Sequence, residues 1–75
     1  MFEEIKEVMV ESLNLNAEDI SINSHLRDDL GVDSLDAAEL IMGLEDQFSL
    51  KIDEDQASKF ATVKDIVDFI EATKN

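Results

Sequence analysis

Residues 33–48 read DSLDAAELIMGLEDQF, and their apolar side chains recur with the spacing of an amphipathic helix. Asp33 stands where an N-terminal cap is expected, and Asp36, three residues later, completes a capping-box pattern. We therefore predict a helix from about Ser34 to Phe48 that turns one full side toward a core. The residues on that side are Ala37, Leu40, Ile41, Leu44 and Phe48.

The opposite side of this predicted helix is not simply polar. Leu35 and Met42 alternate there with acidic residues, and from Asp28 through Leu50 the chain has seven Asp or Glu but no Lys or Arg. Isolated apolar residues on a surface are normal, so a merely solvated helix side is one interpretation. The concentration of acid favours a recognition face, which steers basic partners toward a small apolar contact. The residues of this recognition face are Leu35, Asp36, Glu39, Met42, Glu45 and Asp46.

Upstream of this helix the sequence predicts one more helix and a long loop. Near the N-terminus, glutamates alternate with apolar residues at helical spacing, and Asn14 and Asn16 mark the expected helix end. The apolar positions are Phe2, Ile5, Val8, Met9 and Leu13. Residues 17–32 then form a loop that is long for a small domain, which makes it a candidate functional segment. Its expected anchors on the core are Ile20, Ile22, Leu26, Leu30 and Val32.

Two further helices are predicted downstream. The first is brief and runs from Asp53 to Phe60, with Asp53 and Gln56 as a capping pair. The second follows a capping pair of Thr62 and Asp65 and has Phe69 beside its apolar stripe. That stripe consists of Val63, Ile66, Val67 and Ile70. No alternating strand pattern competes, so we predict an all-α bundle of three main helices plus one short helix, with the long loop between the first and second helices.

The composition of the 75-residue chain restricts its functions. A chain of this length forms one domain, residues 1–75, which is too small for a deep enclosed active site. It has 19 Asp and Glu against six Lys and Arg, a formal net charge of -13, which repels nucleic acid and anionic membranes and favours basic partner surfaces. It has no Cys, so disulfides, zinc–thiolate sites and cysteine nucleophiles are excluded, and any thiol must come from an attached group.

The sequence has no pattern of a targeting or membrane segment. The first ten residues carry four charges, unlike a signal peptide, and no apolar run approaches the ~20 residues of a membrane-spanning helix. We expect a cytoplasmic monomer without membrane insertion, or an organellar protein if a targeting segment has been removed. No metal-ligand cluster is recognisable, and His25, the single histidine, is expected to be a surface or loop-structuring residue.

Ser34 lies where the loop meets the predicted helix, a position where serine is common without any function. Its neighbourhood is more specific, because residues 29–36, DLGVDSLD, resemble the phosphopantetheine attachment motif of acyl carrier proteins. Length, helix order, acidity and motif position agree with that family, so the resemblance covers essentially the whole chain. It continues at residues 39–40, 45–48, 52–55 and 62–67.

The resemblance to acyl carrier proteins implies that a phosphopantetheinyl transferase esterifies 4'-phosphopantetheine to Ser34. Acyl groups would then travel as thioesters on the arm's thiol, and the protein would be a non-catalytic carrier in fatty acid synthesis of the dissociated, bacterial type. Asp33, Leu35 and Asp36 would lie beside the arm, and the recognition face would bind synthesis enzymes with basic docking patches. The alternatives are a carrier in polyketide, D-alanine or aminoacyl transfer and, in another class, an unmodified acidic adaptor.

The residues around Ser34 are compatible with that role. A phosphodiester at a helix start lies near free backbone N–H groups and the positive end of the helix dipole. No adjacent basic residue or His would activate the hydroxyl, so Ser34 is predicted to be a passive acceptor. An apolar cleft between the second and third helices would shelter the acyl chain, although plain core packing is the alternative role of its residues. The candidates for its lining are Leu44, Ile52, Ala57 and Phe60.

Three positions depart from the common pattern of the family. Asp53 stands where many bacterial members have Pro, Gly43 where Ala is usual, and Phe60 where a smaller aliphatic residue is common. Gly43 is expected to cost roughly 0.5–1 kcal/mol of helix stability relative to Ala. Phe60 bears on chain-length preference, which the sequence leaves open together with the identity of the acyl group.

Overall fold

The computed structural model describes residues 1–74, in which the helices are α1 (Phe2–Leu13), α2 (Ser34–Phe48), α3 (Glu54–Ala57) and α4 (Val63–Lys74). A single 3-10 turn, η1 (Ala17–Asp19), lies in the loop between α1 and α2. These residues include no strand, only an isolated bridge between His25 and Thr62. The predicted all-α bundle of three main helices and one short helix is therefore confirmed.

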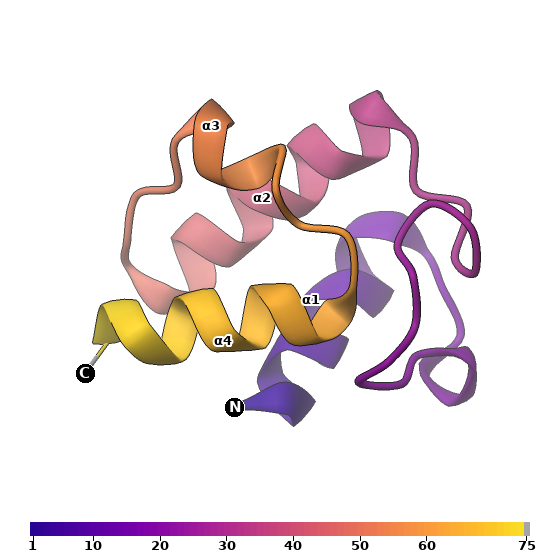
Figure 1. Cartoon of the computed structure of the whole chain (residues 1–75). Coiled ribbons are helices and arrows are strands. Elements are labelled where there is room, and N and C mark those ends of the chain that lie inside the picture. The colour runs from indigo at the N-terminus through magenta and orange to yellow at the C-terminus, as the bar shows by residue number, and fades with distance from the viewer. Residues whose placement is uncertain (75) are drawn as a thin grey trace.

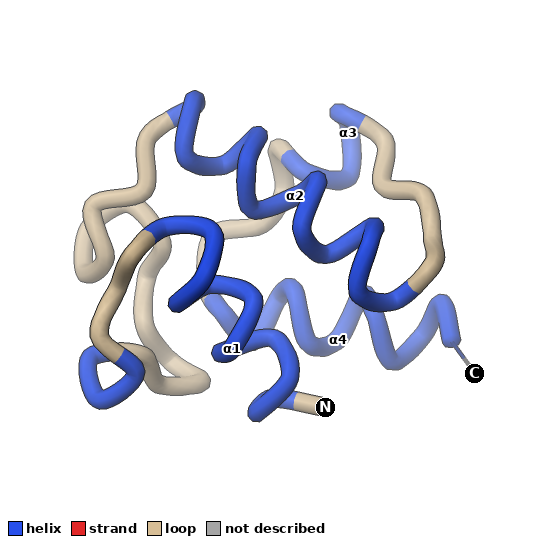
Figure 2. The backbone as a smooth tube through the Cα atoms, turned by 180° about the vertical axis from the view of Figure 1, so that it is seen from behind, coloured by secondary structure: helices blue, strands red, loops and turns tan. Residues whose placement is uncertain are grey.

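The three main helices meet around one core. Figures 1 and 2 show α2 lying across α1 and α4, with α3 beside α2 on the side of α4. The α1–α2 loop gathers at one end of the bundle, where α2 and α4 both begin (Figure 1). Each fully buried aliphatic side chain contributes about 1.5–3 kcal/mol by leaving water. Those side chains are Ile5, Met9, Leu40, Leu44, Val63, Ile66 and Ile70.

The long loop is held on this bundle by both side chains and backbone. Of its predicted apolar anchors, Ile20, Leu26 and Val32 are buried, and Ile22 and Leu30 are half-buried against the core. Three backbone hydrogen bonds, which we call the loop seam, join the loop to the α3–α4 connection and the start of α4. They run from Leu26 N–H to the Ala61 carbonyl (2.9 Å), from Val63 N–H to the Ser24 carbonyl (3.1 Å) and from Lys64 N–H to the Ile22 carbonyl (2.9 Å).

A tight reversal then brings the loop to the start of α2. Gly31 has φ +67°, a left-handed conformation that side chains disfavour, and its N–H donates to the Arg27 carbonyl at 3.2 Å. Val32 N–H donates to the Leu26 carbonyl at 2.8 Å, which closes the reversal. No atom outside Gly31's immediate chain neighbours lies within 4 Å of where a Cβ would be. The backbone angle, and not crowding, therefore requires glycine at this point.

The predicted third helix is wrong in its extent and in its cap. α3 is one turn, Glu54–Ala57, and the Asp53 side chain makes no capping hydrogen bond. Beyond Ala57 the backbone changes to tighter i→i+3 bonds, from Lys59 N–H to the Gln56 carbonyl at 3.1 Å and from Phe60 N–H to the Ala57 carbonyl at 3.2 Å. Phe60 instead turns to the core side, where its ring meets the Phe69 ring edge-on with centroids 5.5 Å apart. Tertiary packing of this aromatic pair overrides the local helical pattern.

The predicted cap of α4 is confirmed as a reciprocal box. Asp65 N–H donates to Thr62 Oγ at 3.3 Å, and Thr62 N–H donates to an Asp65 carboxylate oxygen at 3.1 Å. The same oxygen also accepts from Ala61 N–H at 2.9 Å. The N–H groups of Ala61 and then Thr62 hold the pKa of the Asp65 carboxyl below its ordinary value of 3.8. One carboxylate thus orders both the start of α4 and the residue that completes the loop seam.

Gly43 has a packing role that the sequence did not reveal. A Cβ at this position of α2 would lie 2.7 Å from Ser12 Oγ and 2.9 Å from Val8 Cγ1, both on α1. Such separations are shorter than normal van der Waals contact, so α1 and α2 pack more closely at Gly43 than alanine would allow. The helix-propensity penalty expected for Gly43 is offset by this close contact.

We predict that Gly43→Ala lowers the free energy of unfolding, measured by urea denaturation. Alanine gains about 1 kcal/mol of helix propensity, but overpacking against α1 typically costs about 1–3 kcal/mol. Ser12→Ala removes the nearer clashing atom, so the double variant should recover part of the loss while Ser12→Ala alone stays near wild type. An alanine variant as stable as wild type would show that α1 and α2 are not in tight contact there.

We predict that Asp65→Ala destabilises the protein by about 1 kcal/mol at neutral pH, as expected for loss of a helix cap. Because the folded pKa of Asp65 lies below 3.8, its stabilisation is present above that value and is lost as pH falls through the folded pKa. The difference from wild type in urea denaturation should therefore shrink in strong acid. Asp68→Ala is the control, since its carboxylate pairs with exposed Lys64 at 2.9 Å, and exposed pairs contribute little. A gap between Asp65→Ala and wild type that stays constant with pH would contradict the assignment.

Candidate functional site

The start of α2 is built by Asp33. Its backbone is extended, and its Oδ1 accepts the Asp36 N–H at 2.9 Å, as the sequence predicted. Within residues 1–74 the Asp36 carboxylate makes no return bond to Asp33, so the box is formed by one half only. Val32, buried just before the cap, pins this helix end to the core. The start of α2 is therefore a fixed position in the fold.

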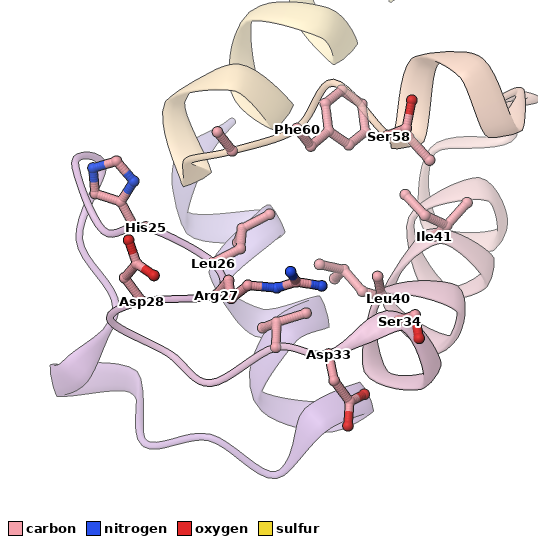
Figure 3. Close-up of a pocket in the computed structure, with 14 residues that line it drawn as sticks. His25, Leu26, Arg27, Asp28, Asp33, Ser34, Leu40, Ile41, Ser58 and Phe60 are labelled. Atoms are coloured by element: carbon pink, nitrogen blue, oxygen red, sulfur yellow. The ribbon is translucent and has the colours of Figure 1, made fainter.

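Ser34 is the first residue of α2 and is exposed. Its hydroxyl has no hydrogen-bond partner in the described part of the chain, so no neighbouring base activates it. His25 lies far from it, on the other side of the region drawn in Figure 3. The described residues also contain no group of three or more His, Cys, Asp or Glu that could hold a metal ion. The hydroxyl is thus open to an incoming reagent but has no catalytic apparatus beside it.

Two cavities open beside Ser34. One, of about 550 Å³, lies between the long loop, α2 and the α3–α4 connection, and we call it the loop cavity (Figure 3). The other, of about 400 Å³, lies between α2 and α3, and we call it the α3 cavity. Ser34, Ala37 and Ile41 line both of them. Both volumes fall in the range of small-molecule pockets, so a group attached to Ser34 has apolar space next to its attachment point.

The predicted cleft residues are distributed unevenly over these cavities. Phe60 lines the loop cavity, Ile52 lines the α3 cavity, and Ala57 lines both. Leu44 is fully buried in the core and lines neither. The larger of the two cavities lies toward the loop, where no cleft was expected from the sequence.

The loop supplies lining residues that were not predicted as part of the site. Leu26 and Val32 were expected only to anchor the loop, and Arg27 was not singled out at all. Their place at the cavity follows from the loop seam, whose partners are far apart in the sequence. The one available signal was the length of the loop, which is typical of functional segments.

The recognition face is largely open to solvent. Leu35 and Met42 are 71% and 63% exposed, unusually high for apolar residues, and Glu39 and Asp46 are exposed beside them. Glu45 differs, because its carboxylate accepts the Ile52 N–H at 2.8 Å. That hydrogen bond ties Glu45 to the α2–α3 connection, so it has a structural role whether or not it also meets a partner.

Comparison with known proteins agrees with these observations. A family model described as the phosphopantetheine attachment site matches residues 3–70. The chain is 49% identical to the acyl carrier protein of Wolinella succinogenes, over 99% of this chain and 97% of that protein. It is 47% identical to the acyl carrier protein of Helicobacter hepaticus, over 97% and 96% of the two chains, and 46% identical to that of a Sulfurovum species, over 95% of each. Across residues 1–74, no helix has the length and apolar character needed to cross a membrane.

Proposed function

The chain belongs to the acyl carrier protein family, and from this premise we propose that it carries acyl groups on 4'-phosphopantetheine attached to Ser34. Members of the family are non-catalytic carriers, and the arm is bound covalently to a serine. The observation that carries the assignment to Ser34 is its position, exposed at the start of α2 and lining both of the cavities found there.

The other serines are less suited to hold the arm. Ser24 is buried and hydrogen-bonded to Ser21, and the Ser58 hydroxyl donates to the Asp55 carbonyl at 2.9 Å. Ser12 packs against Gly43, and Ser49 follows the C-terminal end of α2, where the helix dipole is negative and disfavours a phosphodiester. Ser34 alone combines exposure with the positive end of a main helix.

The site fits the chemistry of the arm. The Asp36 N–H is already bound by the Asp33 carboxylate. The earlier N–H groups of α2, those of Ser34 and Leu35, have no intrahelical partner, and together with the helix dipole they favour a negatively charged phosphodiester on Ser34. Asp33 sets the orientation of that helix end, and we place Leu35 and Asp36 beside the arm. When bound, 4'-phosphopantetheine supplies the thiol for thioester formation, which a chain without Cys lacks. Since Ser34 has no base, a phosphopantetheinyl transferase must supply the one that activates its hydroxyl.

We propose that the acyl chain shelters in the cavities next to Ser34. Ala57, Phe60 and Ile52 contribute apolar walls, and Ala37 and Ile41 of α2 line both cavities. Leu44 supports these walls from the core without lining them. Burial of each methylene of cargo is worth about 0.8 kcal/mol, enough to hold a medium-length chain part of the time and still release it to an enzyme.

The recognition face is the proposed docking surface for the transferase and for fatty acid synthesis enzymes with basic patches. Its acidic residues lie within a chain of net charge -13, which accelerates encounter with positively charged partners. Leu35 and Met42 then supply apolar contact at close range. The same charge opposes self-association, which favours a single-domain monomer, and we propose that it acts in the cytoplasm.

The attachment site is tested by intact mass after incubation with coenzyme A and a broad-specificity phosphopantetheinyl transferase. We expect wild type to gain one phosphopantetheinyl unit and Ser34→Ala to gain none, because no other serine has the required setting. Ser49→Ala is the matched control, since this exposed serine lies at the opposite end of α2, and it should load like wild type. If the wild-type protein gained no phosphopantetheinyl mass, the carrier function would be refuted and an unmodified acidic adaptor would be favoured.

The docking surface is tested by reversing charge at its exposed positions. We expect Glu39→Lys and Asp46→Lys each to lower kcat/KM with a cognate synthesis enzyme by about tenfold at low salt, through slower association. The defect should fade as salt rises. Circular dichroism should report an unchanged helical fold. Glu18→Lys makes the same charge change on η1, away from α2, and should have a smaller effect. Unchanged turnover with every cognate enzyme would remove the assignment.

A further inference from the structure

Arg27 is the only arginine of the chain, and its side chain enters the loop cavity (Figure 3). It is carried there by the long loop, and Figure 3 shows its guanidinium extending toward Leu40 of α2. Over the described 74 residues it has no salt bridge and no side-chain hydrogen bond. A guanidinium has five N–H donors, so this side chain has all of its donors available to a ligand.

The nearby carboxylates are directed elsewhere. Asp33 also lines the cavity, but its carboxylate caps α2 and points away from the cavity in Figure 3. The Asp28 carboxylate lies on the side of the loop that carries His25. The Asp29 carboxylate accepts the His25 N–H at 2.8 Å. In a strongly acidic chain, Arg27 is therefore a local positive charge that no neighbouring side chain neutralises by direct contact.

The rest of the cavity wall is mainly apolar. Leu26, Leu40, Ile41 and Phe60 surround the space that the Arg27 side chain enters. Arg27 is an exposed residue, and an occupant that displaces water from this space removes the part of its hydration that lies within the cavity. That loss is unfavourable unless the occupant offers an acceptor. A hydrocarbon end offers none. A carboxylate matches the planar fork of arginine with two charge-assisted hydrogen bonds.

We propose that the loop cavity accepts acyl groups that end in a carboxylate, the half-thioesters of dicarboxylic acids, and that Arg27 binds that carboxylate. The inference rests on the proposed function, because the cargo reaches this cavity from an arm on Ser34, which lines the same cavity. The apolar walls contact the methylenes of the acyl group, and Arg27 distinguishes a terminal carboxylate from a terminal methyl group. Arg27 is thus a specificity-determining residue of the carrier.

The test compares two cargoes of equal length on the full-length protein, suberoyl and octanoyl, each loaded from its coenzyme A thioester by a broad-specificity transferase. The readout is the rate at which hydroxylamine cleaves the thioester, since a cargo held in the cavity shields it. In wild type we expect the suberoyl thioester to be cleaved about tenfold more slowly than the octanoyl thioester. A tenfold difference is what the free energy of one charge-assisted hydrogen bond would produce. Arg27→Gln should abolish this difference, and Arg27→Lys should retain part of it.

Lys59→Gln is the matched control. It removes the same charge from an exposed residue next to Ser58 and Phe60, but Lys59 does not line the cavity, so the preference for suberoyl should persist. The Arg27 Nε–H signal in nuclear magnetic resonance gives a second readout that needs no variant. It should shift on loading with suberoyl and stay near its unloaded position with octanoyl.

Several outcomes would overturn the inference. Equal cleavage rates for the two cargoes in wild type would do so, as would a suberoyl preference that survives Arg27→Gln. An Arg27 signal that moves when the arm alone is attached, and no further with suberoyl, would assign the guanidinium to the phosphodiester instead. Failure of wild type to gain mass would overturn the proposed function, and this inference with it. Successful loading with equal rates would overturn this inference alone.

Discussion

The loop seam is the contact on which the rest of the site depends. Three backbone hydrogen bonds join residues 22–26 to residues 61–64, segments separated by the whole of α2 and α3. They satisfy backbone groups that would otherwise lie unpaired at the edge of the core. Because the loop is fastened there, Gly31 can reverse the chain within a few residues and deliver Val32 and Asp33 to the start of α2. Ser34 is positioned by this chain of constraints.

The two sides of α2 serve different purposes. Its inner side packs on α1 and α4, and the close approach at Gly43 brings α1 nearer than alanine would permit. Its outer side keeps Leu35 and Met42 in solvent, which is unfavourable for an isolated monomer but suits the docking surface that we propose. Glu45 belongs to the recognition face but also has a structural role, because its carboxylate accepts the Ile52 N–H.

In the function we propose, the site provides attachment and shelter for the cargo and leaves the chemistry to other molecules. Ser34 has an open hydroxyl, a helix N-terminus that suits a phosphodiester, and two neighbouring cavities, but no base. Cavities formed between a fastened loop and short elements of structure can yield to cargo at modest cost, because α3 is a single turn. Arg27 adds a charge to one of these cavities, and so makes the end of the cargo, and not only its length, relevant to binding.

The sequence by itself determined the features that depend on neighbouring residues. The periodicity of apolar residues was enough to predict the helices α1, α2 and α4. The Thr62–Asp65 capping box and the Asp33 cap followed from residue type and spacing. Residue type and spacing also predicted that Ser34 lies at a helix start. They predicted in addition that the outer side of α2 is acidic and partly apolar. The family resemblance, carried by an extended motif, identified the family correctly.

Only the tertiary structure decided the features that join distant segments. The early end of α3 follows from the Phe60–Phe69 contact, and the need for glycine at position 43 follows from α1. Leu44 was expected at the cleft but lies inside the core, whereas Arg27, which no pattern marked, lies in the cavity. Local sequence encodes helical faces and caps because these involve residues a few positions apart. Which side chains meet across the loop seam depends on backbone hydrogen bonds over long sequence separations, and those exist only in the folded chain.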